Sequence, residues 1–234
     1  REGGGRAAYA VADVADFDAL QAVAGLAVRE FGGFDTWVNN AGVSIYGRIE
    51  DVPVADARRL FDTNYWGVVN GSKVAVTHLR RSGGALVNVG STLSDRAIPL
   101  QGHYSASKHA VRGFTDALRM ELEKDGAPVS VSLVKPSGID TPYPEHASNY
   151  MDVEPTLPPP VYAPSVVART ILECAERPVR DVYVGAGGKM IGMLDNVPAV
   201  ADRLMTATMF DMQRRADEPR PEGRRDALYE PMPG

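Results

Sequence analysis

Cysteine is almost absent from the 234-residue sequence, which contains only Cys174. A single cysteine excludes a framework of intrachain disulfides, and its helical, apolar surroundings predict a buried, reduced thiol. The four histidines, at positions 78, 103, 109 and 146, follow no metal-ligand spacing, so we expect no metal site. The sequence also lacks an apolar run of about 18 residues and a signal-like segment. These absences favour a cytoplasmic protein that stays out of the membrane.

Positive charge is not in excess either. The 25 Lys and Arg residues stand against 30 Asp and Glu residues, which gives a net charge of −5. A mildly acidic protein has no broad attraction for a polyanion, so we expect no nucleic-acid partner. The length suits one large domain with a substantial buried core.

Short apolar runs alternate with helix-like segments through most of the chain. The runs lack the strict alternation of half-buried strands, which predicts a parallel sheet covered on both faces. The expected fold class is therefore α/β, with a doubly wound, Rossmann-like parallel sheet. The predicted strands cover residues 7–14, 34–42, 84–91, 129–138 and 180–187, and the predicted helices cover 16–32, 54–81, 102–124 and 164–177.

Small and polar residues follow four of these strands. Ligands of doubly wound sheets bind beyond the carboxyl ends of the strands, which makes these positions candidates for a site. The residues are Asp13 and Val14, NNAG at 39–42, GST at 90–92 and KPSGIDTP at 135–142. Asn64 lies inside a predicted helix, where asparagine has no propensity advantage.

Tyr104 and Lys108 are four residues apart in the predicted helix 102–124, so their side chains project from one face. On an ordinary surface helix such a pair carries no function. Turn chemistry alone can explain each polar strand end. It does not explain why all of them occur together with this tyrosine and lysine.

These motifs together resemble the short-chain dehydrogenase/reductase family, in a bacterial subgroup with a C-terminal extension. The resemblance runs from residue 7 to about residue 187 and rests on NNAG, Asn64, Ser91, Tyr104-x-x-x-Lys108 and KPSGIDTP in the family's order. It implies an NAD(P)-dependent oxidoreductase that transfers hydride between the nicotinamide of NAD or NADP and a small alcohol or ketone substrate. It also implies a homo-oligomer, either a dimer or a tetramer.

The resemblance implies a role for each matching residue. Tyr104 would exchange a proton with the substrate oxygen, and Lys108 would favour the phenolate and hold the nicotinamide ribose. Ser91 would bind the substrate oxygen, and Asn64 would hold a water that links Lys108 to solvent. The implied cofactor contacts are Asp13, Val14, Asn40, Ala41, Gly42, Tyr104, Lys108, Pro136, Ile139 and Thr141.

Two features depart from the family pattern. Ser137 stands where the family usually has glycine, which predicts an altered loop path beside the nicotinamide. The family's opening βαβ unit, with its Gly-rich turn, is missing ahead of the predicted strand 7–14. Such a unit takes about 30 residues. We therefore expect either a longer natural protein or a displaced strand 7–14 with poor dinucleotide binding.

This reading divides the chain into an N-terminally incomplete Rossmann-like domain at 1–187 and a C-terminal extension at 188–234. The helix-like run after Pro198, with apolar Val200, Leu204 and Phe210, predicts packed core or a subunit contact. A membrane-surface helix and a lid over an apolar substrate are the alternatives. The last ~20 residues are charged and proline-rich, so we expect poor order unless they wrap a neighbour.

Residues 142–163 occupy the substrate-loop position of the family. Several prolines stiffen this segment, and Tyr143, Tyr150 and Met151 are candidates for lining an apolar pocket. We favour a lid here over a plain surface connector.

Two other functions fit parts of the sequence. A non-catalytic regulatory or scaffold protein on the same fold would account for the missing Gly-rich turn, but it leaves the four catalytic-type residues unexplained. A sugar-nucleotide epimerase or dehydratase would share the fold, but NNAG, Asn64 and the short C-terminal region argue against it. The substrate and the choice between NAD and NADP stay open.

Overall fold

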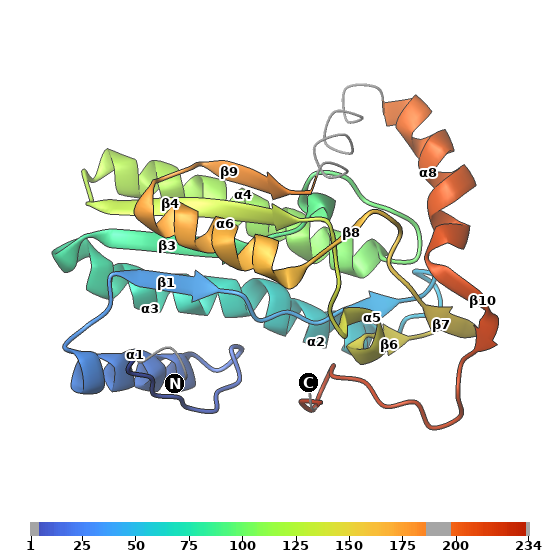
Figure 1. Ribbon diagram of the computed structural model, residues 1–234, viewed down its shortest axis with the longest axis horizontal. Helices are drawn as coiled ribbons and strands as arrows, with labels where there is room; N and C mark the ends of the chain where they lie inside the picture. Colours follow the sequence, from blue (N-terminus) through green and yellow to red (C-terminus); the bar gives the residue numbers. More distant parts are fainter. Residues whose placement is uncertain (1–4, 186–197, 233–234) are drawn as a thin grey trace.

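The computed structural model describes residues 5–185 and 198–232, and a four-stranded parallel sheet with the order β1-β3-β4-β9 lies at its centre (Figure 1). The strands are in continuous register, so Val38 lies opposite Val87 and Asn88 opposite Leu133. The sheet consists of β1 (Thr36–Asn39), β3 (Gly84–Val89), β4 (Val129–Pro136) and β9 (Asp181–Val184).

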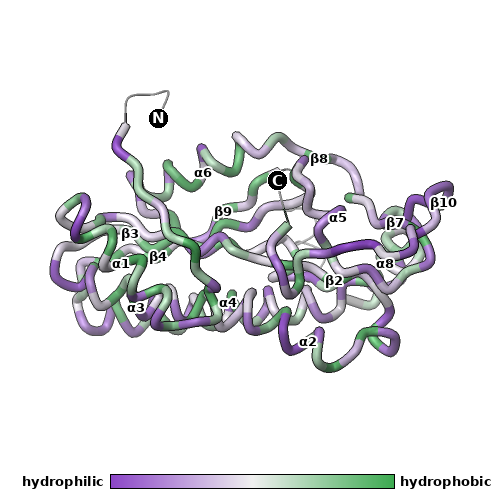
Figure 2. Tube along the Cα trace, turned by 90° about the horizontal axis from the view of Figure 1, so that it is seen from below, coloured by the Kyte–Doolittle hydropathy of each residue, from purple (hydrophilic) through white to green (hydrophobic). Residues whose placement is uncertain are grey.

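Helices cover both faces of this sheet, so the expected doubly wound α/β fold is confirmed. Helices α3 and α4 lie on one face and α6 on the other, and Figure 2 shows the sheet between them. Helix α1 packs against α3. The helices are α1 (Phe17–Phe31), α2 (Val54–Phe61), α3 (Gly67–Ser82), α4 (Gly102–Lys124), α5 (Tyr143–His146), α6 (Pro164–Glu176) and α8 (Pro198–Met212).

Apolar side chains from the sheet form a separate core with each helix layer. On the α6 face, Cys174 is buried with Val87, Val134 and Val184, which confirms the predicted core position of this thiol. On the other face, the cluster contains Ala75, Leu79, Leu86, Leu122 and Val131.

The predicted strand 7–14 is wrong. Residues 5–13 have no regular structure, and the apolar side chains of Tyr9 and Val11 are 90% and 95% exposed. A strand needs a neighbouring strand to pair with its backbone groups, and the described residues supply none beside this segment. Instead, the chain turns at residues 14–15 and enters α1, where Asp16 caps the helix by accepting from the backbone N–H groups of Asp18 and Ala19.

The single helix predicted over 54–81 is divided into three parts. Between α2 and α3, residues Asp62–Trp66 form a π-helical turn called η1. Such a turn adds one residue to the helical repeat and rotates the side chains that follow it. Asn64 lies in this turn and is fully buried.

Short strands at the carboxyl end of the main sheet hold the loops of that end together. Strand β2 pairs with β6 and β5 pairs with β8 in parallel, and β7 pairs with β10 in antiparallel orientation. These strands are β2 (Ile45–Tyr46), β5 (Gly138–Ile139), β6 (Ser148–Asn149), β7 (Val153–Pro155), β8 (Val161–Tyr162) and β10 (Arg214–Pro219). A 3-10 turn, η2 (Thr92–Ser94), follows β3.

The C-terminal segment lies against these loops, which differs from the poor order expected from its composition. The Arg224 guanidinium contacts the Glu154 carboxylate at 2.9 Å and donates to the carbonyl of Pro144 at 2.8 Å. Leu228 is 1% exposed and belongs to the core beside Tyr104. The predicted domain boundary at 187–188 and the last two residues of the predicted strand 180–187 lie outside the described residues.

Helix α8 contributes to the same core, as one of the sequence alternatives predicts. Its buried face carries Ala201 and Met205 at a four-residue spacing. Of the apolar positions named from the sequence, Val200 and Leu204 are exposed. Within the two described ranges, no helix is long and apolar enough to cross a membrane, and no cluster of three or more His, Cys, Asp or Glu side chains could hold a metal ion.

Candidate active site

A pocket of about 260 Å³ opens where the carboxyl ends of β1, β3 and β4 meet. Residues far apart in the sequence line it because the parallel strands all end at this edge of the sheet. Most of the residues predicted from the sequence are among them, namely Asn40, Gly42, Ser91, Tyr104, Lys108, Pro136, Ile139 and Thr141.

Helix α4 brings Tyr104 and Lys108 into this pocket on one of its faces. The Lys108 Nζ donates to the carbonyl oxygen of Val89 at 3.0 Å and lies 5.7 Å from the centroid of the Tyr104 ring. Both residues are buried, with exposures of 8% for Tyr104 and 4% for Lys108. The last residue of β3 thus sets the position of the ammonium group.

Burial dominates the electrostatics of this pair. It raises the pKa of the Tyr104 phenol above its ordinary value, while the hydroxyl groups of Tyr143 and Ser91 act in the opposite direction. Burial lowers the pKa of the Lys108 ammonium to about 8. The amine therefore changes its charge near neutral pH, within the range in which an enzyme works.

Ser91 lies where β3 enters the η2 turn. Its hydroxyl accepts a hydrogen bond from the backbone N–H of Leu93 at 3.1 Å, and its own N–H donates to Ser94 Oγ at 3.1 Å. A serine hydroxyl that accepts one hydrogen bond still has a hydrogen to donate. The turn holds this hydroxyl in the wall of the pocket next to Tyr104.

Asn64 supports the site from behind without lining the pocket. Its side-chain Oδ1 accepts from the backbone N–H of Val43 at 2.8 Å, and its Nδ2 donates to the Val43 carbonyl at 2.9 Å and to Ser107 Oγ at 3.1 Å. These bonds connect the loop that follows β1 to helix α4. The π-helical turn is what directs this side chain inward.

The loop after β1 approaches Lys108 closely at a glycine. A Cβ atom on Gly42 would lie 3.4 Å from Asn64 Oδ1 and 3.8 Å from Lys108 Nζ. Glycine at this position leaves the space beside the ammonium open to a ligand. Asn40 and Ala41 are exposed on the same loop, and Ala41 does not line the pocket.

Asp13 and Val14 also lie outside the pocket wall. The Asp13 carboxylate accepts from the N–H of Ala15 and pairs with Arg59 at 2.9 Å, and both contacts lower its pKa. Val14 packs so closely on Gly67 that a Cβ there would come within 2.5 Å of it. Both residues thus belong to the turn that docks α1 on the helix layer.

Ser137, which replaces the family's usual glycine, fastens the loop after β4. Its hydroxyl and its backbone N–H both donate to the carbonyl of Val184, at 2.9 and 3.0 Å. The loop is therefore joined to the end of β9 just before Gly138 and Ile139 enter the pocket wall. The altered loop path beside the nicotinamide stays a prediction from the sequence.

A buried ion network holds the strands and helix behind the pocket. Asp95, directly after η2, pairs with Lys135 at 3.0 Å and accepts from the hydroxyl of Tyr183 at 2.6 Å. Burial and the neighbouring Asp95 raise the pKa of Tyr183 to about 12. Lys135 is 2% exposed and also lies 3.7 Å from Asp181.

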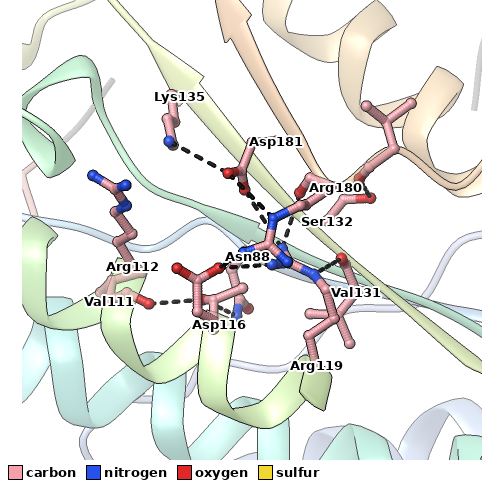
Figure 3. Close-up of polar contacts among 12 residues, drawn as sticks. Asn88, Val111, Arg112, Asp116, Arg119, Val131, Ser132, Lys135, Arg180 and Asp181 are labelled. Carbon is pink, nitrogen blue, oxygen red and sulfur yellow. Dashed lines mark hydrogen bonds and ion pairs between the residues drawn. The ribbon is translucent and has the colours of Figure 1, made fainter. Parts of the chain in front are cut away.

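Figure 3 shows how this network continues into helix α4. Arg119 pairs with Asp116 at 2.7 Å and donates to the carbonyl of Val131 at 3.0 Å. Asp116 also pairs with Arg180, next to Asp181. The network thereby ties α4, which carries Tyr104 and Lys108, to β4 and β9.

Several pocket residues escape prediction from motifs. Helix α8 supplies Met209 and the turn before α4 supplies Gln101, whereas residues 157–160 belong to the predicted substrate loop 142–163. Gln101 follows Leu100, whose φ of 66° is unusual for a residue other than glycine. Of the three loop residues named from the sequence, Tyr143 lines the pocket, whereas Tyr150 and Met151 pack in the core beside it.

Comparison with known proteins gives consistent matches. A family model described as short chain dehydrogenase matches residues 1–151. The uncharacterized oxidoreductase YxnA of Bacillus subtilis is 46% identical over 236 residues, and the alignment covers 98% of this chain but only 65% of YxnA. The putative oxidoreductase SadH of Mycobacterium tuberculosis is 34% identical, with 79% of this chain and 70% of SadH covered.

A solved structure is also similar. The short-chain dehydrogenase of Burkholderia cenocepacia in complex with NADP superposes with a TM-score of 0.71 at 26% identity. The match covers 87% of this chain and 81% of that one.

Proposed function

Because this chain belongs to the short-chain dehydrogenase family, we propose that it is an NAD(P)-dependent oxidoreductase that interconverts an alcohol and a ketone. The observation that carries the proposal is the convergence of Ser91, Tyr104 and Lys108 on one pocket at the carboxyl edge of the sheet. The oxidoreductase names of the relatives and the NADP bound to a similar structure support it.

The residues present fit a nicotinamide nucleotide. The exposed loop of Asn40–Gly42 leaves space beside the buried ammonium of Lys108, which bonds the Val89 carbonyl. We assign cofactor binding to this loop, to Lys108 and to the loop containing Pro136, Ile139 and Thr141. Asp13, Val14 and Ala41 stay in the proposed set as contacts beyond the pocket. When bound, the nicotinamide supplies or accepts the hydride.

The protein's own contribution is to place the substrate oxygen and to move a proton. In ketone reduction, the phenol of Tyr104 gives its proton to the oxygen while the carbonyl carbon receives hydride. The hydroxyl of Ser91 donates to the same oxygen and stabilises the charge that develops there. Lys108 holds positive charge beside the tyrosine below a pH of about 8.

Asn64 enters the proposal as a positioning residue. Both hydrogens of its amide are committed to Val43 and Ser107, so the side chain fixes the loop after β1 against α4. A water near Asn64 that links Lys108 to solvent stays a prediction of the family resemblance.

The pocket wall favours an uncharged substrate with an apolar substituent. Lys108 is the one charged side chain among the described lining residues. Away from the polar groups, the wall consists of aliphatic side chains and prolines, including Leu93, Ile98, Leu157 and Met209. A cytoplasmic location and assembly into a homodimer or homotetramer stay predictions from the sequence.

The test is oxidation of NADH and NADPH, followed by absorbance, with a panel of aliphatic, cyclic and aryl ketones. We expect turnover with at least one apolar ketone and a loss of 100-fold or more in Tyr104→Phe, on the order of a general-acid contribution. A Tyr104→Phe protein that stays folded and keeps full activity would overturn the proposed role. The nucleotide that supports turnover identifies the cofactor.

A further inference from the structure

A second tyrosine lies next to the proposed catalytic one. Tyr143 begins α5, and its ring meets that of Tyr104 nearly edge to face, with centroids 5.9 Å apart at 70°. It lines the same pocket. The two hydroxyl-bearing rings therefore reach this pocket from separate elements, α4 and the loop that follows β5.

The hydroxyl oxygen of Tyr143 is buried and makes no hydrogen bond of normal geometry with a described residue, although the hydroxyl groups of Ser44 and Tyr104 lie near enough to affect its pKa. A buried polar group without a partner is uncommon and calls for an explanation, such as a ligand or a catalytic role. Its pKa is raised well above the ordinary value, first by burial and then by Tyr104 and Tyr46. The group therefore stays protonated and keeps a hydrogen to donate.

Tyr104 needs such a donor because Lys108 does not reach its oxygen. The Lys108 Nζ is bonded to the Val89 carbonyl, and the structure places it beside the Tyr104 ring. Its pKa of about 8 means that much of its charge is lost in alkaline solution, where phenols ionise. Stabilisation of the phenolate then depends on neutral donors.

Resting on the proposed function, we propose that Tyr143 is a positioning residue for proton transfer, whose hydroxyl donates a hydrogen bond to the phenolate oxygen of Tyr104. Ser91 is the other neutral donor of the site. In support, both hydroxyl groups lower the pKa of Tyr104 against the effect of burial. The bond strengthens when Tyr104 is ionised, so it favours the state that accepts a proton.

The C-terminal tail holds α5 and with it the Tyr143 ring. Arg224 donates to the carbonyls of Pro144 and Glu145, and the N–H of Ala227 donates to the carbonyl of His146. All three acceptors belong to the single turn that Tyr143 begins. The C-terminal extension thereby fixes the turn that carries Tyr143, and it acts on Tyr104 through the Tyr143 side chain.

Few titratable groups face Tyr104. Helix α4 contributes Lys108, α5 contributes Tyr143, and β2 contributes Tyr46, whose own pKa is raised first by burial and then by Tyr104 and Glu145. The other buried members of the core cluster that contains Tyr104 are apolar, namely Ile45, Val52, Leu60, Leu93, Ile98, Met205 and Leu228, and Tyr150 is partly buried against the cluster. A change in the Tyr104 titration on removal of one hydroxyl is therefore simple to interpret.

The experiment is a pH titration by fluorine NMR of protein labelled with 3-fluorotyrosine. Fluorine makes phenols more acidic, which brings the titration to milder pH, and Tyr104→Phe identifies the Tyr104 signal among the nine tyrosines. We expect the Tyr104 midpoint to rise by about one pH unit in Tyr143→Phe. The matched control is Tyr150→Phe, on the same loop, whose hydroxyl bonds Asp56; it should leave the midpoint unchanged.

An unchanged or lower midpoint in Tyr143→Phe would overturn the inference. Should the labelled protein unfold before Tyr104 titrates, the pH dependence of kcat/KM for alcohol oxidation reports the same ionisation. Its acid limb should move to higher pH in Tyr143→Phe, and an unmoved limb overturns the inference. The titration needs no turnover, so its result is independent of the Tyr104→Phe activity test of the proposed function.

Discussion

The side-chain amide of Asn64 pairs with both backbone groups of Val43, accepting from its N–H at 2.8 Å and donating to its carbonyl at 2.9 Å. The same amide donates to Ser107 on α4. The fully buried Asn64 side chain thus bonds the backbone of Val43 as a neighbouring strand would. It thereby fixes the loop after β1 beside Lys108.

This relationship predicts a large effect of removing the amide. Asn64→Ala leaves both backbone groups of Val43 without their partner, while Ser107 Oγ keeps its bond to the Tyr104 carbonyl, so we expect the free energy of unfolding to fall by about 2–4 kcal/mol. Asn64→Asp should also destabilise, because a carboxylate cannot donate to the Val43 carbonyl. Urea unfolding measures both, with the exposed Asn40→Ala as control; an Asn64→Ala loss no larger than that of the control would contradict the assignment.

The buried Lys108 predicts a characteristic pH dependence of stability. Its pKa is about 8 in the folded protein against 10.5 ordinarily, so between these values the unfolded chain binds a proton that the folded protein has released. The contribution of Lys108 to stability therefore increases as pH rises through this window. At pH 7, Lys108→Met should be the more stable protein by up to about 3 kcal/mol, and its advantage should shrink by pH 10.

Urea unfolding of wild type and Lys108→Met at three pH values checks this, since the difference between the two proteins cancels the other titrating groups. Lys124→Met replaces an exposed lysine on the same helix and serves as control. A wild-type-to-variant difference that stays constant with pH, or that grows in favour of Lys108→Met, would show that Lys108 is not buried as described.

The Asp95–Lys135 pair predicts strong coupling. Asp95→Asn leaves the buried Lys135 without its nearest counter-ion, so we expect a loss of about 3–5 kcal/mol. The double variant Asp95→Asn, Lys135→Met removes the stranded charge and should recover part of that loss. A double-mutant cycle measures the coupling energy, and additive losses would mean that the two groups do not interact.

The contacts of Arg224 predict that the tail is part of the folded unit. Arg224→Ala should lower the free energy of unfolding by about 1–3 kcal/mol, because the partly buried Glu154 carboxylate loses its ion-pair partner. Amide hydrogen exchange should accelerate at Ala227, whose N–H bonds the His146 carbonyl. The neighbouring Arg225→Ala, on an exposed arginine, is the matched control. Equal exchange rates of the Ala227 amide in the two variants would contradict the inference that Arg224 holds the tail against the protein.

Local sequence patterns predicted the elements that depend on local interactions. Helix α4 has the predicted bounds, and Tyr104 and Lys108 share its pocket face as their spacing requires. The π-helical turn at Asn64 could not be predicted this way, because it depends on contacts with Val43 and Ser107 from other elements. An unexplained asparagine inside a helical pattern was the one available signal.

The other differences between the sequence predictions and the structure depend on contacts between residues far apart in the sequence. The segment 7–14 has the composition of a strand but no neighbour among the described strands. The composition of the tail suggests poor order, yet Arg224 finds partners 70 to 80 residues away. Of the apolar positions that the sequence predicts for α8, Phe210 packs against the core, whereas Val200 and Leu204 are exposed and the buried face carries Ala201 and Met205.

The most direct test of the central claim is a fluorescence titration of the purified protein with NADH and NADPH, with the intact mass measured beside it. We predict saturable binding of at least one nucleotide, weakened tenfold or more in Lys108→Met and little changed in Lys124→Met. Failure of both nucleotides to bind, or equal binding by wild type and Lys108→Met, would contradict the claim that this pocket holds a nicotinamide cofactor.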